Sequence, residues 1–141
     1  MTTIVDSFVT VAPDCPVERA VVPTPRGEKV PVHALQYELL TAKPYHYTHE
    51  TLILETELRR ANLTRADAKT KQAFREKLFS KSHACLRASA LSQKYGWGVH
   101  YDAAGKIALY AMESAAYRNY SAGKSGGPQV VAAMRSKKTA S

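Results

Sequence analysis

Proline crowding near the N-terminus is the feature that most limits how this chain can fold. Five of the seven prolines lie between residues 13 and 31. Each proline fixes φ and removes a backbone donor, and it pushes the preceding residue out of the α region. Residues 13–31 therefore predict an extended connection with a turn at 26–29. It separates a first strand, over residues 4–11, from the rest of the chain.

Helical patterns follow this connection. Apolar residues spaced three and four apart predict three helices, over residues 31–43, 49–61 and 64–80. Thr48 is placed to cap the second helix. Thr64 is placed to cap the third, in a capping box with aspartate instead of glutamate. A shorter helix is expected over 113–120.

The clearest strand pair lies in the C-terminal half. Residues 98–101 and 107–110 flank Asp102-Ala103-Ala104-Gly105, which is typical of a hairpin built on a type I turn with a left-handed glycine. Alternation puts Val99 and Tyr101 on one face and Gly98 and His100 on the other.

Together these elements predict an α+β fold in one domain over residues 1–141. We expect a small antiparallel sheet, made of the N-terminal strand and the hairpin, covered on one face by about three helices. Residues 121–128 are rich in Ser and Gly and predict a flexible linker or insert. Residues 129–134 fit either a strand or a helix, and residues 135–141 predict a frayed basic tail.

The composition is typical of a cytoplasmic protein. Hydrophobic residues make up 45% of the chain, which suffices for a core, and no run of about 18 apolar residues could span a membrane. The N-terminus lacks the basic and apolar regions of a secretion signal. Two cysteines, Cys15 and Cys85, do not make a disulfide framework, so we expect free thiols.

The formal charge of +8 is concentrated in residues 59–94, where ten basic residues face only Asp67 and Glu76. Such a stretch indicates an anionic partner or a well-solvated face. On a helical wheel the cations of the third helix surround it and form no stripe, and no helix-turn-helix, zinc-finger or RNP pattern is visible. We therefore expect nucleic-acid binding to be weak and non-specific at most.

The spacing of residues decides how far three catalytic or metal-binding motifs are present. Gly123-Lys124-Ser125 is no phosphate loop, because Arg118 stands where the pattern needs its first glycine. The cysteines and histidines have no zinc spacing, so we expect no metal and no cofactor. His83, Cys85 and Arg87 could form a reactive group if the thiol were activated. An ordinary buried cysteine is the competing interpretation.

The most site-like segment covers residues 80–100, where glycines flank the only tryptophan. We expect one concave binding surface made of Arg87, Lys94, Tyr95, Trp97 and His100. Its cations and aromatic rings suit an anionic ligand with a flat, apolar part. The competing interpretation makes Trp97 a core anchor.

Three classes of function follow. The preferred one is non-catalytic binding of an anionic small molecule, a nucleotide or a protein partner. One alternative is an enzyme that uses the His83, Cys85 and Arg87 region, and the other is a non-specific nucleic-acid accessory protein.

Several runs of residues carry a family resemblance. They are Cys85-Leu86-Arg87, Tyr95-Gly96-Trp97-Gly98-Val99-His100-Tyr101-Asp102 and Gly105-Lys106-Ile107-Ala108-Leu109-Tyr110, with Asp14-Cys15-Pro16 near the start and Met134-Arg135-Ser136-Lys137-Lys138 near the end. The chain resembles an uncharacterised family of small bacterial proteins, a domain of unknown function, over nearly its whole length. The insert at 121–127 departs from that pattern. The resemblance implies no activity.

Overall fold

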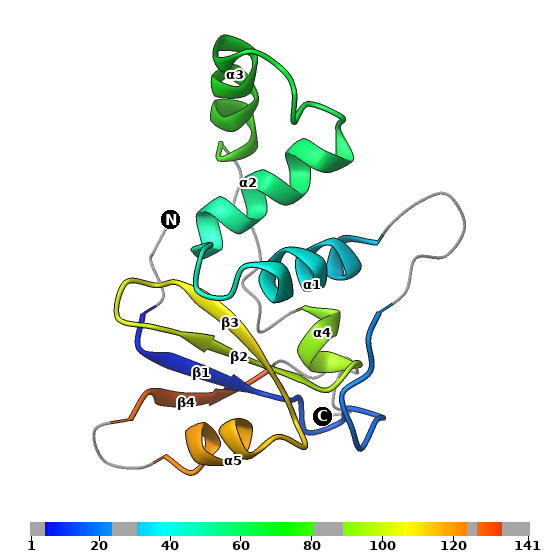
Figure 1. The fold of residues 1–141 in the computed structure, drawn as a ribbon, viewed down its shortest axis with the longest axis vertical. Coiled ribbons are helices and arrows are strands. Elements are labelled where there is room, and N and C mark those ends of the chain that lie inside the picture. The colour runs from blue at the N-terminus through cyan, green and yellow to red at the C-terminus, as the bar shows by residue number, and fades with distance from the viewer. Residues whose placement is uncertain (1–4, 24–30, 81–88, 124–126, 134–141) are drawn as a thin grey trace, which may run out of the picture.

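A computed structural model describes residues 5–23, 31–80, 89–123 and 127–133, and within them a four-stranded sheet packs with helices (Figure 1). The elements in chain order are β1 (Ser7–Thr10), α1 (Val32–Ala42), α2 (His49–Arg60), α3 (Ala68–Leu78), α4 (Ala90–Gln93), β2 (Trp97–Tyr101), β3 (Ile107–Ala111), α5 (Ala115–Ser121) and β4 (Gln129–Ala132). The α+β fold class is confirmed.

The sheet has the strand order β3-β2-β1-β4. The hairpin forms as predicted: the Asp102 carboxylate accepts bonds from the backbone N–H groups of Ala104 and Lys106, and Gly105 has a φ of 81°. β1 pairs antiparallel with β2, which places Val9 opposite Val99. Residues 129–132 form a strand that runs parallel to β1, so the sheet is mixed and not wholly antiparallel.

The main core lies between one face of the sheet and the helices α1 and α2. Val99 and Tyr101 of β2 are fully buried there, as the alternation predicts, against Leu40 of α1 and Leu52 of α2. Burying a side chain of this size stabilises the fold by about 1.5–3 kcal/mol.

The opposite face of the sheet is covered as well, contrary to the expectation of helices on one face. Tyr117 of α5 packs edge-on against Phe8, with ring centroids 5.3 Å apart. Gly98 makes the room, because a Cβ there would lie 2.6 Å from the Tyr117 ring. The Tyr117 hydroxyl accepts a bond from the Val11 N–H at 2.9 Å. A glycine in the middle strand thus lets a helix dock on the second face.

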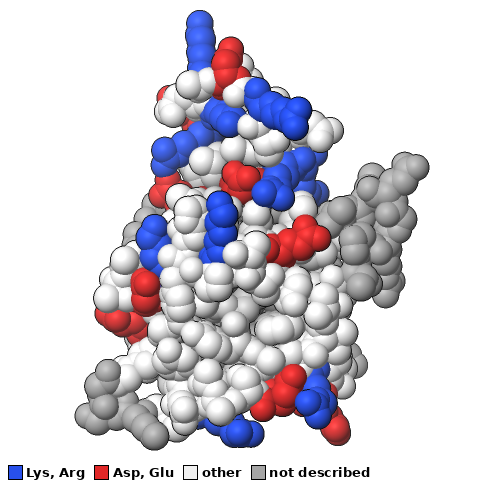
Figure 2. Space-filling model, in the orientation of Figure 1, with Lys and Arg blue, Asp and Glu red and all other residues white. Residues whose placement is uncertain are grey.

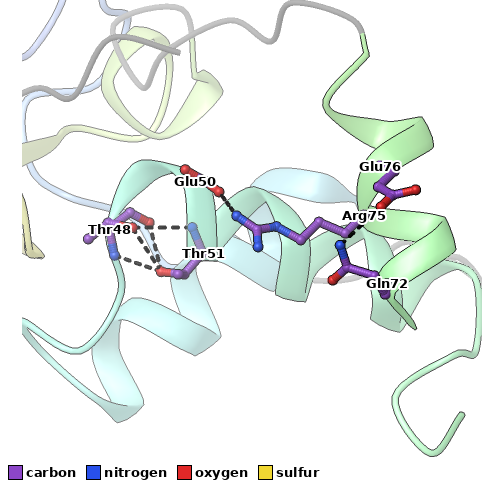
Figure 3. A network of polar contacts seen from close by, with 6 residues as sticks. All are labelled: Thr48, Glu50, Thr51, Gln72, Arg75 and Glu76. Carbon is purple, nitrogen blue, oxygen red and sulfur yellow. Dashed lines mark hydrogen bonds and ion pairs between the residues drawn. The ribbon is translucent and has the colours of Figure 1, made fainter. Parts of the chain in front are cut away.

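The ends of α2 follow the predicted local chemistry. Thr48 and Thr51 form a reciprocal capping box at its start (Figure 3). At its end Asn62 adopts a φ of 57°, and the Leu63 N–H donates to the Leu58 carbonyl at 2.8 Å. This is the hydrogen-bond pattern of a Schellman motif.

Two other helix predictions need correction. α3 is capped by Asp67, whose carboxylate accepts from the Thr70 N–H at 2.7 Å, and not by Thr64, because the Ala66 N–H still closes a turn onto Leu63. The short helix α4 lies within residues 80–100, where the sequence pattern predicts no helix. Its buried Ser92 donates to the Trp97 carbonyl at 2.6 Å and so ties α4 to the start of β2.

None of the helices in the described ranges has the length and apolar character needed to cross a bilayer.

Candidate functional site

Trp97 and His100 stand on opposite faces of β2. The Trp97 ring lies 5.2 Å from the ring of Tyr37 on α1. The His100 ring stacks on Tyr120 of α5 at 4.3 Å. Three positions apart on a strand, the two side chains must point to different faces. Trp97 and His100 therefore do not line one common surface, and whether any of the predicted residues binds a ligand stays a prediction.

Lys94, Tyr95 and Trp97 do lie together, beside α1. His33 of that helix stacks on Tyr95, with ring centroids 4.9 Å apart and planes 26° apart. Tyr37, one turn further on, covers Trp97. Trp97 is half-buried, so it is not a fully buried core anchor. We call this group the aromatic surface: His33, Tyr37, Lys94, Tyr95 and Trp97.

An apolar edge borders the aromatic surface. The Val21 N–H donates to the Tyr95 carbonyl at 2.8 Å, and the Trp97 indole N–H donates to the Val21 carbonyl at 2.9 Å. These bonds hold the proline-rich segment beside the rings. Val21 and Val22 remain 44% and 52% exposed there. Exposed apolar residues next to partly exposed rings are typical of a binding surface.

The electrostatics of the aromatic surface are set by one cation and one imidazole. Burial, and then the charge of Lys94, lower the pKa of His33 below its ordinary value. His33 is therefore neutral at pH 7, while the exposed Lys94 ammonium carries the positive charge. A bound anion would pair with Lys94 and remove the repulsion that disfavours a protonated His33.

The other face of the sheet carries a second group, the tyrosine cluster, made of Tyr45, Tyr110 and Tyr120 around His100. The Tyr45 hydroxyl lies 2.8 Å from His100 Nδ1 and 2.6 Å from the Tyr110 hydroxyl. All four side chains are half-buried. The direction of each hydrogen bond depends on which nitrogen of His100 carries the proton.

Tyr45 reaches this cluster through an unusual backbone. It has a φ of 59°, a left-handed conformation that costs a non-glycine residue about 1 kcal/mol or more. Its N–H donates to the Ile107 carbonyl at 2.9 Å, and the Ile107 N–H donates to the Tyr47 carbonyl. These two bonds hold the connection between α1 and α2 along the edge of β3. The Tyr45 side chain can then reach His100 and Tyr110 on the sheet.

Burial favours the uncharged forms of Tyr45, Tyr110 and His100. It raises the pKa of Tyr45, helped by the hydrogen bond and charge of Tyr110, and it raises the pKa of Tyr110. Burial also lowers the pKa of His100, although the charge of Asp102 opposes this. Tyr45 and Tyr110 thus present protonated phenols to a neutral imidazole, and a proton can pass between hydrogen-bonded groups of this kind.

Part of the predicted site cannot be placed in the structure. His83, Cys85 and Arg87 lie outside the described residues, and so do 24–30 and the tail from 134. Cys15 is a free thiol. No group of three His, Cys, Asp or Glu side chains in the described part of the chain could hold a metal ion.

Sequence reasoning missed the partners that complete both groups. His33 and Tyr37 are spaced i, i+4 on a predicted helix, so a shared face was visible, but their contact with β2 was not. Tyr110 lies opposite Gly98 in the hairpin register. Because Gly98 and His100 share a face of the sheet, this register places Tyr110 on the same face. No local pattern in the sequence marks Tyr45 and Tyr120 as neighbours of His100. Tyr45 lies in the connection between α1 and α2, and Tyr120 lies in the short helix α5.

Comparison with known proteins finds a matching family model but no matching curated protein or solved structure. No curated protein and no solved structure shows a significant match to the chain. One family model, described as a family of unknown function (DUF6157), matches residues 1–139. The chain belongs to this family.

Proposed function

We propose that this member of a family without an assigned activity is a cytoplasmic binding protein, which takes an anionic small molecule with a flat, apolar part at the aromatic surface. One observation carries the proposal. Lys94 stands beside the stacked rings of His33 and Tyr95, next to the exposed Val21. A cation beside an apolar, aromatic wall is the combination that such a ligand needs.

The chemistry of recognition divides between the two parts of the ligand. Its flat part would lie against the Trp97 ring and the edge formed by Val21 and Val22, where apolar contact displaces water. Its anionic group would pair with Lys94 and accept a bond from a protonated His33. Mononucleotides and aromatic carboxylates both have this form. The catalytic alternative rests on His83, Cys85 and Arg87, which lie outside the described residues.

The single tryptophan supplies a direct test, because all indole fluorescence comes from Trp97. A panel of mononucleotides and aromatic carboxylates is screened for a rise in melting temperature, since a ligand bound only to the native state raises it. Fluorescence titration then gives the dissociation constant of each hit. Lys94→Gln should weaken binding about 5-fold, the value of an exposed ion pair of about 1 kcal/mol. Lys43→Gln, at an exposed cation beyond the far end of α1, should leave it unchanged.

Binding should also depend on pH, and the sign follows from His33. Its pKa is lowered in the free protein, and a neighbouring anion raises it, so binding takes up a proton. Affinity should therefore increase as the pH falls from neutral and His33 becomes protonated in the complex. His33→Gln should remove that dependence. Hits whose affinity is the same in the Lys94→Gln and Lys43→Gln variants, with no pH dependence, would overturn the proposed site.

A further inference from the structure

α3 and its approach form an arm, residues 59–80, that extends from the body of the protein (Figure 1). No residue of α3 is buried, and its main packing partner is α2. A helix of 11 residues with polar groups on most sides is marginally stable by itself. Such an element is more easily understood as a surface for a partner than as part of the core.

The arm is strongly positive, in contrast to the other described residues, where five cations face nine carboxylates. It has seven cations and only two carboxylates, and Lys and Arg gather over this end of the molecule (Figure 2). Both of its carboxylates are occupied: Asp67 caps α3, and Glu76 accepts from Gln72 (Figure 3). The negative charge within the arm is thereby tied to local structure.

Some of the cations are also neutralised locally. Glu50 pairs with Arg75, and Glu55 and Glu57 pair with Arg59 and Arg60. Three exposed cations of the arm make no ion pair with any described residue. They are Arg65, Lys69 and Lys77.

Two of the three cations without an ion pair to a described residue share one side of α3. Lys69, Ala73 and Lys77 follow one another at i, i+4 and i+8, so they share one side of the helix, and all three are exposed. Lys71 and Arg75 lie on the opposite side, where Lys71 is half-buried and Arg75 pairs with Glu50. Two turns place Lys69 and Lys77 about 12 Å apart, with the small side chain of Ala73 between them. A partner can therefore approach the backbone closely between two ammonium groups.

The side chains of the arm fit a polyanion better than a protein. The large hydrophobic residues exposed in the described chain are Val5, Val21 and Val22, and none lies in the arm. Stable protein interfaces need an apolar or aromatic centre, whereas nucleic-acid interfaces are polar and strongly positive. We propose that the arm binds the phosphate backbone of a nucleic acid without reading its sequence. The amide of Gln72, the side chain of α3 best suited to reading adenine, is already bonded to Glu76.

Fluorescence anisotropy with a short labelled DNA duplex tests this proposal in the full chain. Three phosphate contacts predict a slope of about −2.7 for log affinity against log salt, so binding should weaken about 40-fold between about 50 and about 200 mM salt. The triple variant Arg65→Gln/Lys69→Gln/Lys77→Gln should lose the slope and most of the low-salt affinity. Each single variant should reduce the slope by about 1, which protects the test if the triple variant loses helix by circular dichroism.

A matched control removes the same charge from the body. Arg19, Lys43 and Arg118 are exposed and lie outside the arm, and their triple exchange to Gln should keep a slope close to that of the wild type. Equal losses in both triple variants would overturn the proposal, because net charge alone would then explain binding. A strong preference for one DNA sequence, or binding to poly-glutamate but not to DNA, would overturn it as well. None of these readouts uses the aromatic surface.

Discussion

The sheet and the arm are held in place by different forces. Phe8, Val99 and Tyr101 on the sheet are shielded from water by helices on both faces. α3 has no buried residue and is attached to α2 through half-buried side chains and the exposed Glu50–Arg75 pair (Figure 3). Hydrophobic burial yields kilocalories per side chain, whereas exposed ion pairs yield fractions of one. The sheet can therefore support a precise surface, while the arm can move or unfold locally at little cost to the rest.

The largest expected difference comes from equal truncations in the two regions. Leu40→Ala removes a fully buried side chain from the core and should lower the free energy of unfolding by about 2–5 kcal/mol. Leu78→Ala makes the same change at a half-buried position of α3 and should cost about 1 kcal/mol or less. Urea denaturation of the two variants measures both values. Equal losses would mean that the arm is packed as tightly as the core.

An intermediate effect is expected in the tyrosine cluster. Tyr45→Phe removes the hydroxyl that bonds both His100 and Tyr110 and should destabilise the protein by about 1–2 kcal/mol, because two half-buried polar groups lose a partner. Tyr37→Phe is the matched control, since the Tyr37 hydroxyl makes no hydrogen bond within the described part of the chain.

The stability difference between Tyr45→Phe and Tyr37→Phe should also depend on pH. The pKa values of Tyr45 and Tyr110 are raised by burial, so above about pH 10 tyrosines ionise more readily in the unfolded chain than in the folded one. The unfolded state then holds fewer protons, and stability falls as the pH rises. This loss should be smaller in Tyr45→Phe than in Tyr37→Phe. Identical alkaline curves for the two variants would show that the phenol network contributes nothing.

The smallest effect is expected at the arm's own ion pair. Glu50 and Arg75 are 42% and 45% exposed, so water and salt screen their attraction. A double-mutant cycle with Glu50→Gln and Arg75→Gln should give a coupling of about 0.2–1 kcal/mol that shrinks as salt is added. A salt-independent coupling above about 2 kcal/mol would contradict the view that the arm is loosely held.

Features with local causes were predictable from the sequence. Thr48 caps α2, Asn62 ends it, and the Asp102–Gly105 turn sets the alternation of β2, because each depends on residues within a few positions. α4 was missed because its four residues are too few for a periodic pattern. Both Asp67 and Thr64 can cap a helix, and only the turn at Ala66 decides between them.

The composition of the site depended on contacts between distant residues, which no pattern in the sequence specifies. Residues two apart on a strand share a face, so Trp97 lies on the face of Val99 and His100 lies on the face of Gly98. Alternation alone therefore already shows that Trp97 and His100 cannot line one surface. The partners of each ring could not be derived. Stacking of His33 on Tyr95 and of Tyr120 on His100 depends on how α1 and α5 lie on the sheet, and helix placement follows from the whole core.

The parallel pairing of β1 with β4 has a consequence for the order of assembly. The β2–β3 hairpin closes across residues 102–106, whereas β1 must pair with β2 across residues 11–96 and β4 must align beside β1 across almost the whole chain. Closing long loops costs entropy before any contact repays it. On a ribosome β1 emerges first and yet acquires its second neighbour last. Folding should therefore begin at the hairpin and finish at β1, with docking of residues 129–132 as the slow, final step.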